Sequence, residues 1–191
     1  MGKIVVTEFI SLDGVIEAPG GGEAYKHAGW TFEFDRGEDG DAFKLDEVLE
    51  AEAQLLGRRT YEGFAAAWPS YSDNVGFAQK MNTMPKYVVS KTLESADWEN
   101  STILSGALVD DVTKLKNDMD GVILVAGSAQ LVQGLLEHDL VDELRLMVFP
   151  IVLGAGKRLW GETTDKKRFT LADSKAVGDG IAILTFRRSG A

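Results

Sequence analysis

Short apolar segments of strand character alternate with helical segments along most of this chain, and this alternation constrains the fold more than any other feature. Strands are predicted at 3–11, 54–56, 86–89, 102–104 and 121–126. Helices are predicted at 42–53, 60–68, 108–119 and 129–137. Repeated strand–helix–strand units produce a mainly parallel sheet that helices cover on both faces. The predicted fold class is therefore α/β.

The last third of the chain contains strand patterns without further helices. Residues 144–153 are rich in β-branched and aromatic side chains, and 169–171 and 181–187 are further predicted strands. We therefore expect an antiparallel addition at the edge of the sheet. Because the 191 residues contain no repeat and no linker, residues 1–191 are predicted to form one domain.

Composition excludes several classes of protein. The chain has no cysteine, which rules out disulfides, thiolate metal sites and cysteine nucleophiles, and His27 and His138 lack the spacing of metal ligands. A net charge of -10 disfavours binding to nucleic acids or anionic membranes. The sequence shows neither a signal peptide nor an apolar run of about 18 residues. We expect a cytoplasmic protein that acts on a small molecule and needs no metal.

A glycine and two arginines follow the predicted strand at 54–56. In Gly57-Arg58-Arg59-Thr60, the glycine permits close approach of a ligand to the backbone, and the guanidinium groups suit phosphate. A helix that begins here adds free amides and a partial positive charge. The segment predicts an anion site. The alternative interpretation is that Thr60 caps the helix and both arginines are solvated.

Two more polar segments follow strands of the same predicted sheet. Ser90-Lys91-Thr92 follows the strand at 86–89, and Gly127-Ser128-Ala129-Gln130 follows the strand at 121–126. Each segment alone is compatible with an ordinary turn. In parallel sheets, however, ligands bind beyond the carboxyl ends of the strands, so the three segments should meet along one edge. Together they suit a dinucleotide, although the glycine fingerprints of the common nucleotide folds are absent.

Short motifs in a fixed order resemble a known superfamily. They occur at 11–14 (Ser-Leu-Asp-Gly), 57–62, 86–90, 127–128 and 140–154. This order resembles the dihydrofolate reductase superfamily, in the bacterial branch related to the C-terminal reductase domain of the riboflavin biosynthesis deaminase-reductase. The match spans nearly the whole chain. The resemblance implies a three-layer fold with a mixed, mostly parallel sheet, and it implies NADPH as cofactor.

The resemblance also implies roles for particular residues. Thr7, Phe9 and Trp30 would lie near nicotinamide and substrate. Classical members use one acid on the first helix, for which Asp35, Asp41 and Asp46 compete here, and Asp13 and Asp41 are the candidate catalytic acids. The implied cofactor-binding residues are Gly57, Arg58, Arg59, Thr60, Ser90, Lys91, Thr92, Gly127, Ser128, Ala129 and Gln130.

The implied activity is NADPH-dependent hydride transfer to a small heterocycle, most like 5-amino-6-(5-phosphoribosylamino)uracil. A basic pocket with Lys157 or Arg158 would favour this phosphorylated substrate, whereas a salt-bridged acid near the nicotinamide would favour a pterin. A nucleotide-binding module without turnover is the alternative from another class. We expect residues 20–30 to close over the substrate as a lid. Since relatives are often dimers, a homodimer is expected.

Overall fold

The computed structural model describes residues 1–190 and contains one eight-stranded sheet, with strand order β4-β3-β2-β5-β1-β6-β8-β7. The strands are β1 (Lys3–Ser11), β2 (Ala51–Gly57), β3 (Lys86–Val89), β4 (Ser101–Leu104), β5 (Val122–Val125), β6 (Glu143–Phe149), β7 (Phe169–Val177) and β8 (Ile181–Arg188). The helices are α1 (Gly37–Glu50), α2 (Arg58–Ala67), α3 (Phe77–Thr83), α4 (Leu108–Asp118) and α5 (Ala129–Glu137), with 3-10 turns η1 (Trp30–Glu33) and η2 (Trp68–Ser70).

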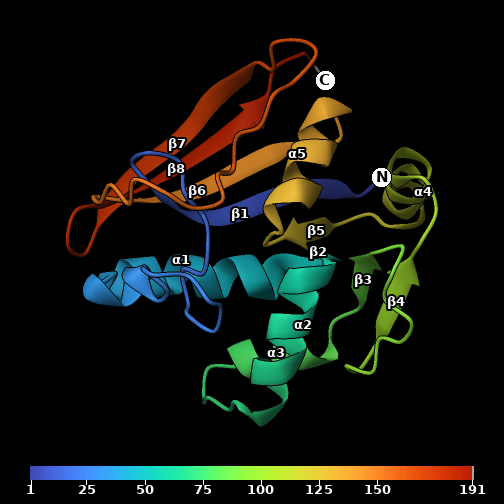
Figure 1. The fold of residues 1–191 in the computed structure, drawn as a ribbon, viewed down its shortest axis with the longest axis horizontal. Helices are drawn as coiled ribbons and strands as arrows, with labels where there is room; N and C mark the ends of the chain where they lie inside the picture. Colours follow the sequence, from blue (N-terminus) through green and yellow to red (C-terminus); the bar gives the residue numbers. More distant parts are fainter. Residues whose placement is uncertain (191) are drawn as a thin grey trace.

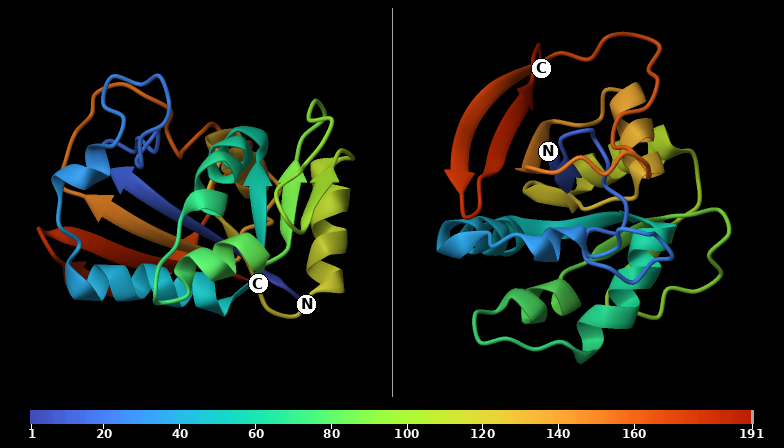
Figure 2. Two further views of the ribbon diagram at one scale, coloured as in Figure 1. Left: turned by 90° about the horizontal axis from the view of Figure 1, so that it is seen from below. Right: turned by 60° about the vertical axis from the view of Figure 1, so that its left-hand side comes forward.

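Strand direction follows the expected pattern. Strands β1 to β6 pair only in parallel with one another, whereas β8 pairs antiparallel with β6 and β7 pairs antiparallel with β8. The β7–β8 hairpin forms one edge of the sheet, and β4 forms the other (Figures 1 and 2). The predicted α/β class, with a mostly parallel sheet and an antiparallel C-terminal edge, is confirmed.

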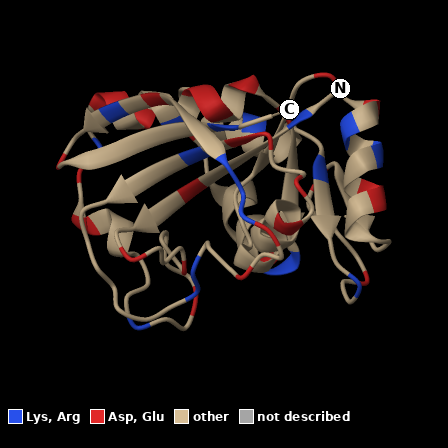
Figure 3. Cartoon of the chain, turned by 90° about the horizontal axis from the view of Figure 1, so that it is seen from above, with Lys and Arg blue, Asp and Glu red and all other residues tan. Residues whose placement is uncertain are grey.

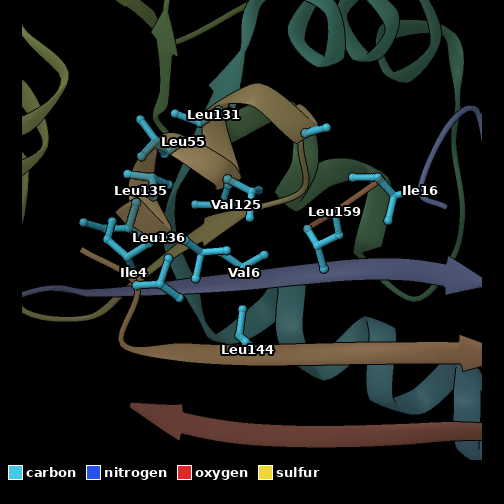
Figure 4. Close-up of a cluster of buried hydrophobic side chains, with 14 of the residues drawn as sticks. Ile4, Val6, Ile16, Leu55, Val125, Leu131, Leu135, Leu136, Leu144 and Leu159 are labelled. Atoms are coloured by element: carbon cyan, nitrogen blue, oxygen red, sulfur yellow. The ribbon is translucent and has the colours of Figure 1, made fainter. Parts of the chain in front are cut away.

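Two helix layers cover the sheet and create its core (Figure 1). On one face, Leu131 and Leu135 of α5 pack with Ile4 and Val6 of β1, as Figure 4 shows. The opposite face is covered by α1, α2 and α3. Because the short central strand β5 is buried on both faces, its sequence is continuously apolar rather than alternating. No helix within residues 1–190 combines the length and the apolarity needed to cross a membrane.

Several predicted boundaries were wrong. The helix predicted to reach residue 53 ends at Glu50, and β2 begins at Ala51. Alanine and glutamate favour helices, but Ala51 and Ala53 are fully buried in the sheet, where tertiary packing overrides propensity. Thr60 does not cap α2, which begins at Arg58 after Gly57. The short helix α3 was not predicted at all.

The strand predicted at 144–153 was extended too far at its C-terminal end. Strand β6 ends at Phe149, and Pro150 follows it directly. Proline has no backbone N–H and cannot donate to a sheet ladder, which accounts for the end of the strand at this position.

A buried lysine connects α3 to the sheet. Lys86 is fully buried, and its Nζ donates to the carbonyls of Asn82 (2.6 Å), Met84 (2.9 Å) and Glu99 (2.9 Å). The same nitrogen lies 4.2 Å from the centre of the Trp98 ring. Burial lowers the pKa of this ammonium to about 8. The lysine thereby satisfies carbonyls at the C-terminal end of α3 that have no helical partner.

Replacing Lys86 with methionine is expected to lower the free energy of unfolding by about 2 to 4 kcal/mol, because three carbonyls lose their shared donor. Urea denaturation monitored by circular dichroism measures this change. Lys114 lies exposed on α4, so Lys114→Met is the matched control and should change stability by less than about 0.5 kcal/mol. Equal losses in the two variants would show that the carbonyl contacts of Lys86 contribute little.

Candidate cofactor and substrate site

Three turns lie together at the carboxyl edge of the parallel strands. Strands β3, β2 and β5 are neighbours and run in the same direction, so residues 90–92, 57–60 and 127–130 leave the sheet on one side. The Gly57 amide donates to the Gly127 carbonyl at 3.2 Å. Arg58 Nη1 donates to Thr92 Oγ1 at 2.7 Å. We call these three segments the turn cluster.

Two glycines allow the turns to touch. A Cβ at Gly57 would overlap Ser128 Oγ and would lie 3.0 Å from the Ser128 backbone nitrogen. Gly127 has φ of +95°, and a Cβ there would lie 2.9 Å from Thr60 Oγ1. The Gly127–Ser128 peptide bond is cis. A Cβ at Gly57 would press against the Ser128 backbone, and any side chain at Gly127 would be strained by its positive φ.

Two helices begin at the turn cluster. Gly57 precedes α2 and Ser128 precedes α5, and neither helix has a side-chain cap. The first amides of each helix have no intrahelical acceptor, and the aligned peptide dipoles place partial positive charge there. The turn cluster therefore offers backbone donors suited to an anion.

The cations of the turn cluster differ in their contacts. Arg58 is held by Glu62, whose Oε1 lies 2.7 Å from its Nε, as well as by Thr92. Arg59 is exposed and makes no ion pair with any other residue in the range 1–190. Ser90 Oγ accepts the Thr92 and Leu93 amides and so shapes its own turn. Arg59 is thus the more available cation, and the cofactor-binding roles stay predictions.

Glu8 is a buried acid beside the turn cluster that the sequence analysis missed. It lies on β1, is 7% exposed, and its Oε1 has no hydrogen-bond partner among the described residues. A Cβ at Gly127 would lie 3.7 Å from this oxygen. Burial raises the pKa of Glu8 to about 8, against a smaller lowering by Lys44. At neutral pH the carboxyl is therefore mostly protonated and can donate a hydrogen bond.

Thr7 and Phe9 point to the opposite face of β1, because side chains alternate along a strand. Thr7 Oγ1 lies 2.9 Å from Glu47 Oε2 and accepts from Lys44 Nζ at 2.7 Å. Lys44 and Glu47 form an ion pair at 2.6 Å, and Lys44 Nζ lies 4.9 Å from the centre of the Phe9 ring. The predicted substrate residues Thr7 and Phe9 thus meet an ion pair from α1.

The acid that α1 directs inward is Glu47, which was not among the candidates. Its side chain is 1% exposed, and one carboxylate oxygen lacks a hydrogen-bond partner in the described chain. Asp35, Asp41 and Asp46 are all exposed, and Asp41 pairs with Arg36 at 2.8 Å. Sequence alone gives little signal for Glu47, since a glutamate on a charged helix is usually solvated.

Asp13 connects the turn after β1 to the loop at 153–154. Its carboxylate accepts hydrogen bonds from Ser11 Oγ (2.7 Å) and from the amides of Leu153 (3.1 Å) and Gly154 (2.9 Å). The Ser11 hydrogen bond and these amides lower the pKa of Asp13 to about 2. A carboxylate that stays ionised at neutral pH is suited to holding loops and is not suited to donating a proton.

Trp30 belongs to the core rather than to an open surface. It is 1% exposed, its Nε1 donates to the Glu17 carbonyl at 2.9 Å, and its ring packs edge-on against Phe149 at 5.3 Å. Phe149 in turn packs against Phe9 at 5.6 Å. Among these aromatic pairs, Phe149 is therefore the link between Trp30 and Phe9.

The expected lid is tied to the loop at 154–158. Tyr25 donates to the Ala155 carbonyl at 2.6 Å, and Lys157 pairs with Glu17 (2.9 Å) and Glu23 (3.1 Å). Arg158 Nε donates to the Asp13 carbonyl at 3.0 Å. Both cations considered for a substrate phosphate are thus engaged with loop residues. Opening of residues 20–30 would require the contacts of Tyr25 with Ala155 and of Glu23 with Lys157 to break.

Solved structures define the class of the fold. A putative riboflavin biosynthesis protein from Shewanella sp. PV-4 aligns with 98% of this chain and 99% of its own, with a TM-score of 0.79 and 23% identity. A dihydrofolate reductase from Enterococcus faecalis, complexed with NADP(H), aligns with 98% of this chain and 96% of its own, with a TM-score of 0.58 and 15% identity. The chain therefore has the dihydrofolate reductase-like fold that the motifs predicted.

Sequence comparison defines the family. The model of the RibD C-terminal domain matches residues 2–183, and the chain therefore belongs to the RibD C-terminal domain family. YwjB of Bacillus subtilis (strain 168) is 29% identical over 183 residues, which cover 95% of each chain. This family and the fold are those of reductases, which supports an oxidoreductase in general.

Proposed function

We propose that this chain is an NADPH-dependent reductase that transfers hydride to a small heterocycle, most like 5-amino-6-(5-phosphoribosylamino)uracil. The observation that carries the proposal is the contact between the turns at Gly57 and Gly127, which joins two helix N-termini at one sheet edge. The structural neighbour from Enterococcus faecalis, which is complexed with NADP(H), supports this choice of cofactor.

The turn cluster fits the phosphates of such a cofactor. Backbone amides at the starts of α2 and α5 would bind the pyrophosphate, and Arg58 and Arg59 would contribute charge for the pyrophosphate and the 2′-phosphate. Arg58 is already oriented by Glu62 and Thr92, so less conformational freedom is lost when an anion binds. In a chain of net charge -10, such a local cationic pair also attracts the cofactor.

NADPH supplies the hydride when bound, and the protein has to position the substrate and exclude water. Phe9 offers an aromatic surface to a heterocycle, and Lys44 Nζ holds protons near that surface. Glu8, on the other face of β1, would present a neutral carboxyl to the cofactor side. These residues would position the substrate and polarise it, and hydride transfer demands little more from the protein.

A pterin is the second candidate substrate, and Glu47 favours it. A buried, salt-bridged acid on the first helix is the feature expected for pterin recognition, and Glu47 has an oxygen without a hydrogen-bond partner within residues 1–190. Steady NADPH oxidation with dihydropterin, compared with the ribosylaminopyrimidine, distinguishes the two. Cofactor affinity without turnover of either would favour a binding module.

The cofactor site is tested with Arg58→Ala and Arg59→Ala. Each variant is expected to raise the Kd for NADPH about tenfold, because a charged hydrogen bond to phosphate is lost. Isothermal titration calorimetry measures this affinity. Arg187 lies on β8, which the sheet order separates from β2 by three strands, and Arg187→Ala should leave the Kd unchanged. If neither Arg58→Ala nor Arg59→Ala changes the Kd, the cofactor does not bind at the turn cluster.

A further inference from the structure

A pocket of about 300 Å³ opens at the opposite end of α5 from the turn cluster. Its lining comes from the end of α5 and the residues after it, from the segment that leads into β7, and from the end of β8. Since α5 begins at the turn cluster and has nine residues, its length of about 13 Å separates the two regions. The pocket is therefore distinct from the proposed cofactor site.

The charge of the pocket differs from that of the rest of the molecule. Four of its lining residues are cationic, and Asp139 is the one acid that lines it; the cations are Lys166, Lys167, Arg168 and Arg188. Lys167 is held by the Glu137 carbonyl (2.8 Å) and by Asp139 (3.2 Å). The nearby Glu137 carboxylate accepts from the Thr164 amide and hydroxyl.

Three cations of the pocket are not neutralised. Lys166, Arg168 and Arg188 form no ion pair with any described residue, in a chain whose net charge is -10. Figure 3 marks lysine and arginine in blue and shows basic stretches beside the C-terminal end of the chain. Concentrated positive charge in a concave site raises the local concentration of anions.

Arg188 provides the second observation. Its Nε is buried and has no hydrogen-bond partner within residues 1–190. Buried donors in folded proteins nearly always have a partner, because a lost hydrogen bond costs free energy. The Arg188 amide donates to the Asp142 carbonyl at 3.0 Å, so the backbone that carries the guanidinium is fixed. Arg188 also lines the pocket, so an anion there would bring an acceptor to this guanidinium group.

We propose that this pocket is a second anion site, which binds a small phosphate monoester through Arg188 and the neighbouring cations. A dianion suits a lining with four cations and one acid, and the arginine fork matches the geometry of phosphate oxygens. The apolar part of the ester would lie against Leu136, Val141 and Phe169. A volume of about 300 Å³ limits the occupant to a small molecule.

The experiment is a titration of the full chain, labelled with nitrogen-15, with phenyl phosphate, inorganic phosphate and benzoate. The side-chain Nε–Hε signal of Arg188 and the backbone amides of Phe169 and Ser189 report this pocket. The amides of Gly57 and Gly127 report the turn cluster separately, so phosphate binding there is not confused with binding here. We expect saturable shifts at Arg188, with phenyl phosphate bound about tenfold more tightly than benzoate.

Arg188→Met is expected to weaken phenyl phosphate binding at least about tenfold. Arg187→Met is the matched control, because Arg187 is the adjacent residue, points to the other face of β8 and pairs with Glu143 at 3.2 Å. Lys166→Met and Arg168→Met change exposed residues, so both variants should fold even if Arg188→Met does not. Each should weaken phenyl phosphate binding about threefold, which tests the contribution of the positive charge.

The proposal is wrong if the Arg188 signal does not move with phenyl phosphate, if benzoate binds as tightly, or if Arg187→Met loses as much affinity as the pocket variants. If inorganic phosphate binds as tightly as phenyl phosphate, the apolar group contributes nothing to binding, and the proposal that the ligand is a phosphate ester is wrong. None of these results bears on NADPH binding, which the titrations of Arg58 and Arg59 variants test independently.

Discussion

Replacing Gly57 with alanine is expected to weaken NADPH binding more than about tenfold, because the start of α5 has to shift by a few tenths of an ångström and a displacement of about 1 Å can cost about 100-fold. The new Cβ would overlap Ser128 Oγ, which rotation of the serine side chain can relieve. It would also lie 3.0 Å from Ser128 Cβ and from the Ser128 backbone nitrogen, and rotation does not relieve these contacts. The start of α5 must therefore move away from the start of α2, so their amides no longer converge on one anion.

The control for this prediction is Gly63→Ala in the same helix. A Cβ at Gly63 meets no atom within 4 Å, so the substitution should leave NADPH affinity unchanged. It should raise the free energy of unfolding by about 0.5 to 1 kcal/mol, because alanine favours helix. Calorimetry and urea denaturation measure the two quantities. Unchanged NADPH affinity in Gly57→Ala would show that contact between these turns does not position the cofactor.

Glu8 is expected to make the protein less stable as pH rises. The folded-state pKa of about 8 lies above the ordinary value of 4.5, so between these values the folded chain holds a proton that the unfolded chain has released. The contribution of Glu8 to the free energy of unfolding should therefore be greatest below about pH 4.5. This contribution should decline as the pH rises from 4.5 to about 8. The decline is up to about 5 kcal/mol.

Glu8→Gln keeps the shape and removes the titration, so its stability should vary much less between pH 5 and pH 9 than that of the wild type. Urea denaturation at a series of pH values measures the slope. Glu162 is exposed, and Glu162→Gln should retain the wild-type slope. Asp13 does not interfere, because its stabilising contribution is lost between its ordinary pKa of 3.8 and its folded-state pKa of about 2, below the pH range measured. Identical slopes for wild type and Glu8→Gln would contradict the burial of a neutral carboxyl.

The parts of the fold that could be predicted are those with a strong local signal. The helix at 129–137 was predicted with its exact bounds, because apolar residues repeat at helical spacing and a turn precedes it. The boundary at Ala51 could not be predicted, since Ala-Glu-Ala is locally helical and becomes a strand only when it pairs with β5. Thr60 was considered as a helix cap because threonine is a favoured residue at that position, which is again a local signal.

Charged residues in the interior were the main omission from the sequence analysis. Glu8, Glu47 and Lys86 look like ordinary surface charges in the sequence, yet all three are buried. Their surroundings come from distant parts of the chain: Glu47 meets Thr7 forty positions away, and Lys86 meets the Glu99 carbonyl. No local pattern encodes such partners, because burial depends on which elements pack together.

The sequence by itself determined the alternation of strands and helices apart from α3, the mainly parallel class of the sheet, and the polar turns at 57–60, 90–92 and 127–130, since periodicity and glycine placement act over a few residues. Only the tertiary structure decided that Gly57 contacts Ser128, that Glu8 is buried beside Gly127, and that Arg188 lines a basic pocket. These features depend on distances between segments far apart in the chain, and such distances are fixed when the sheet and its two helix layers pack.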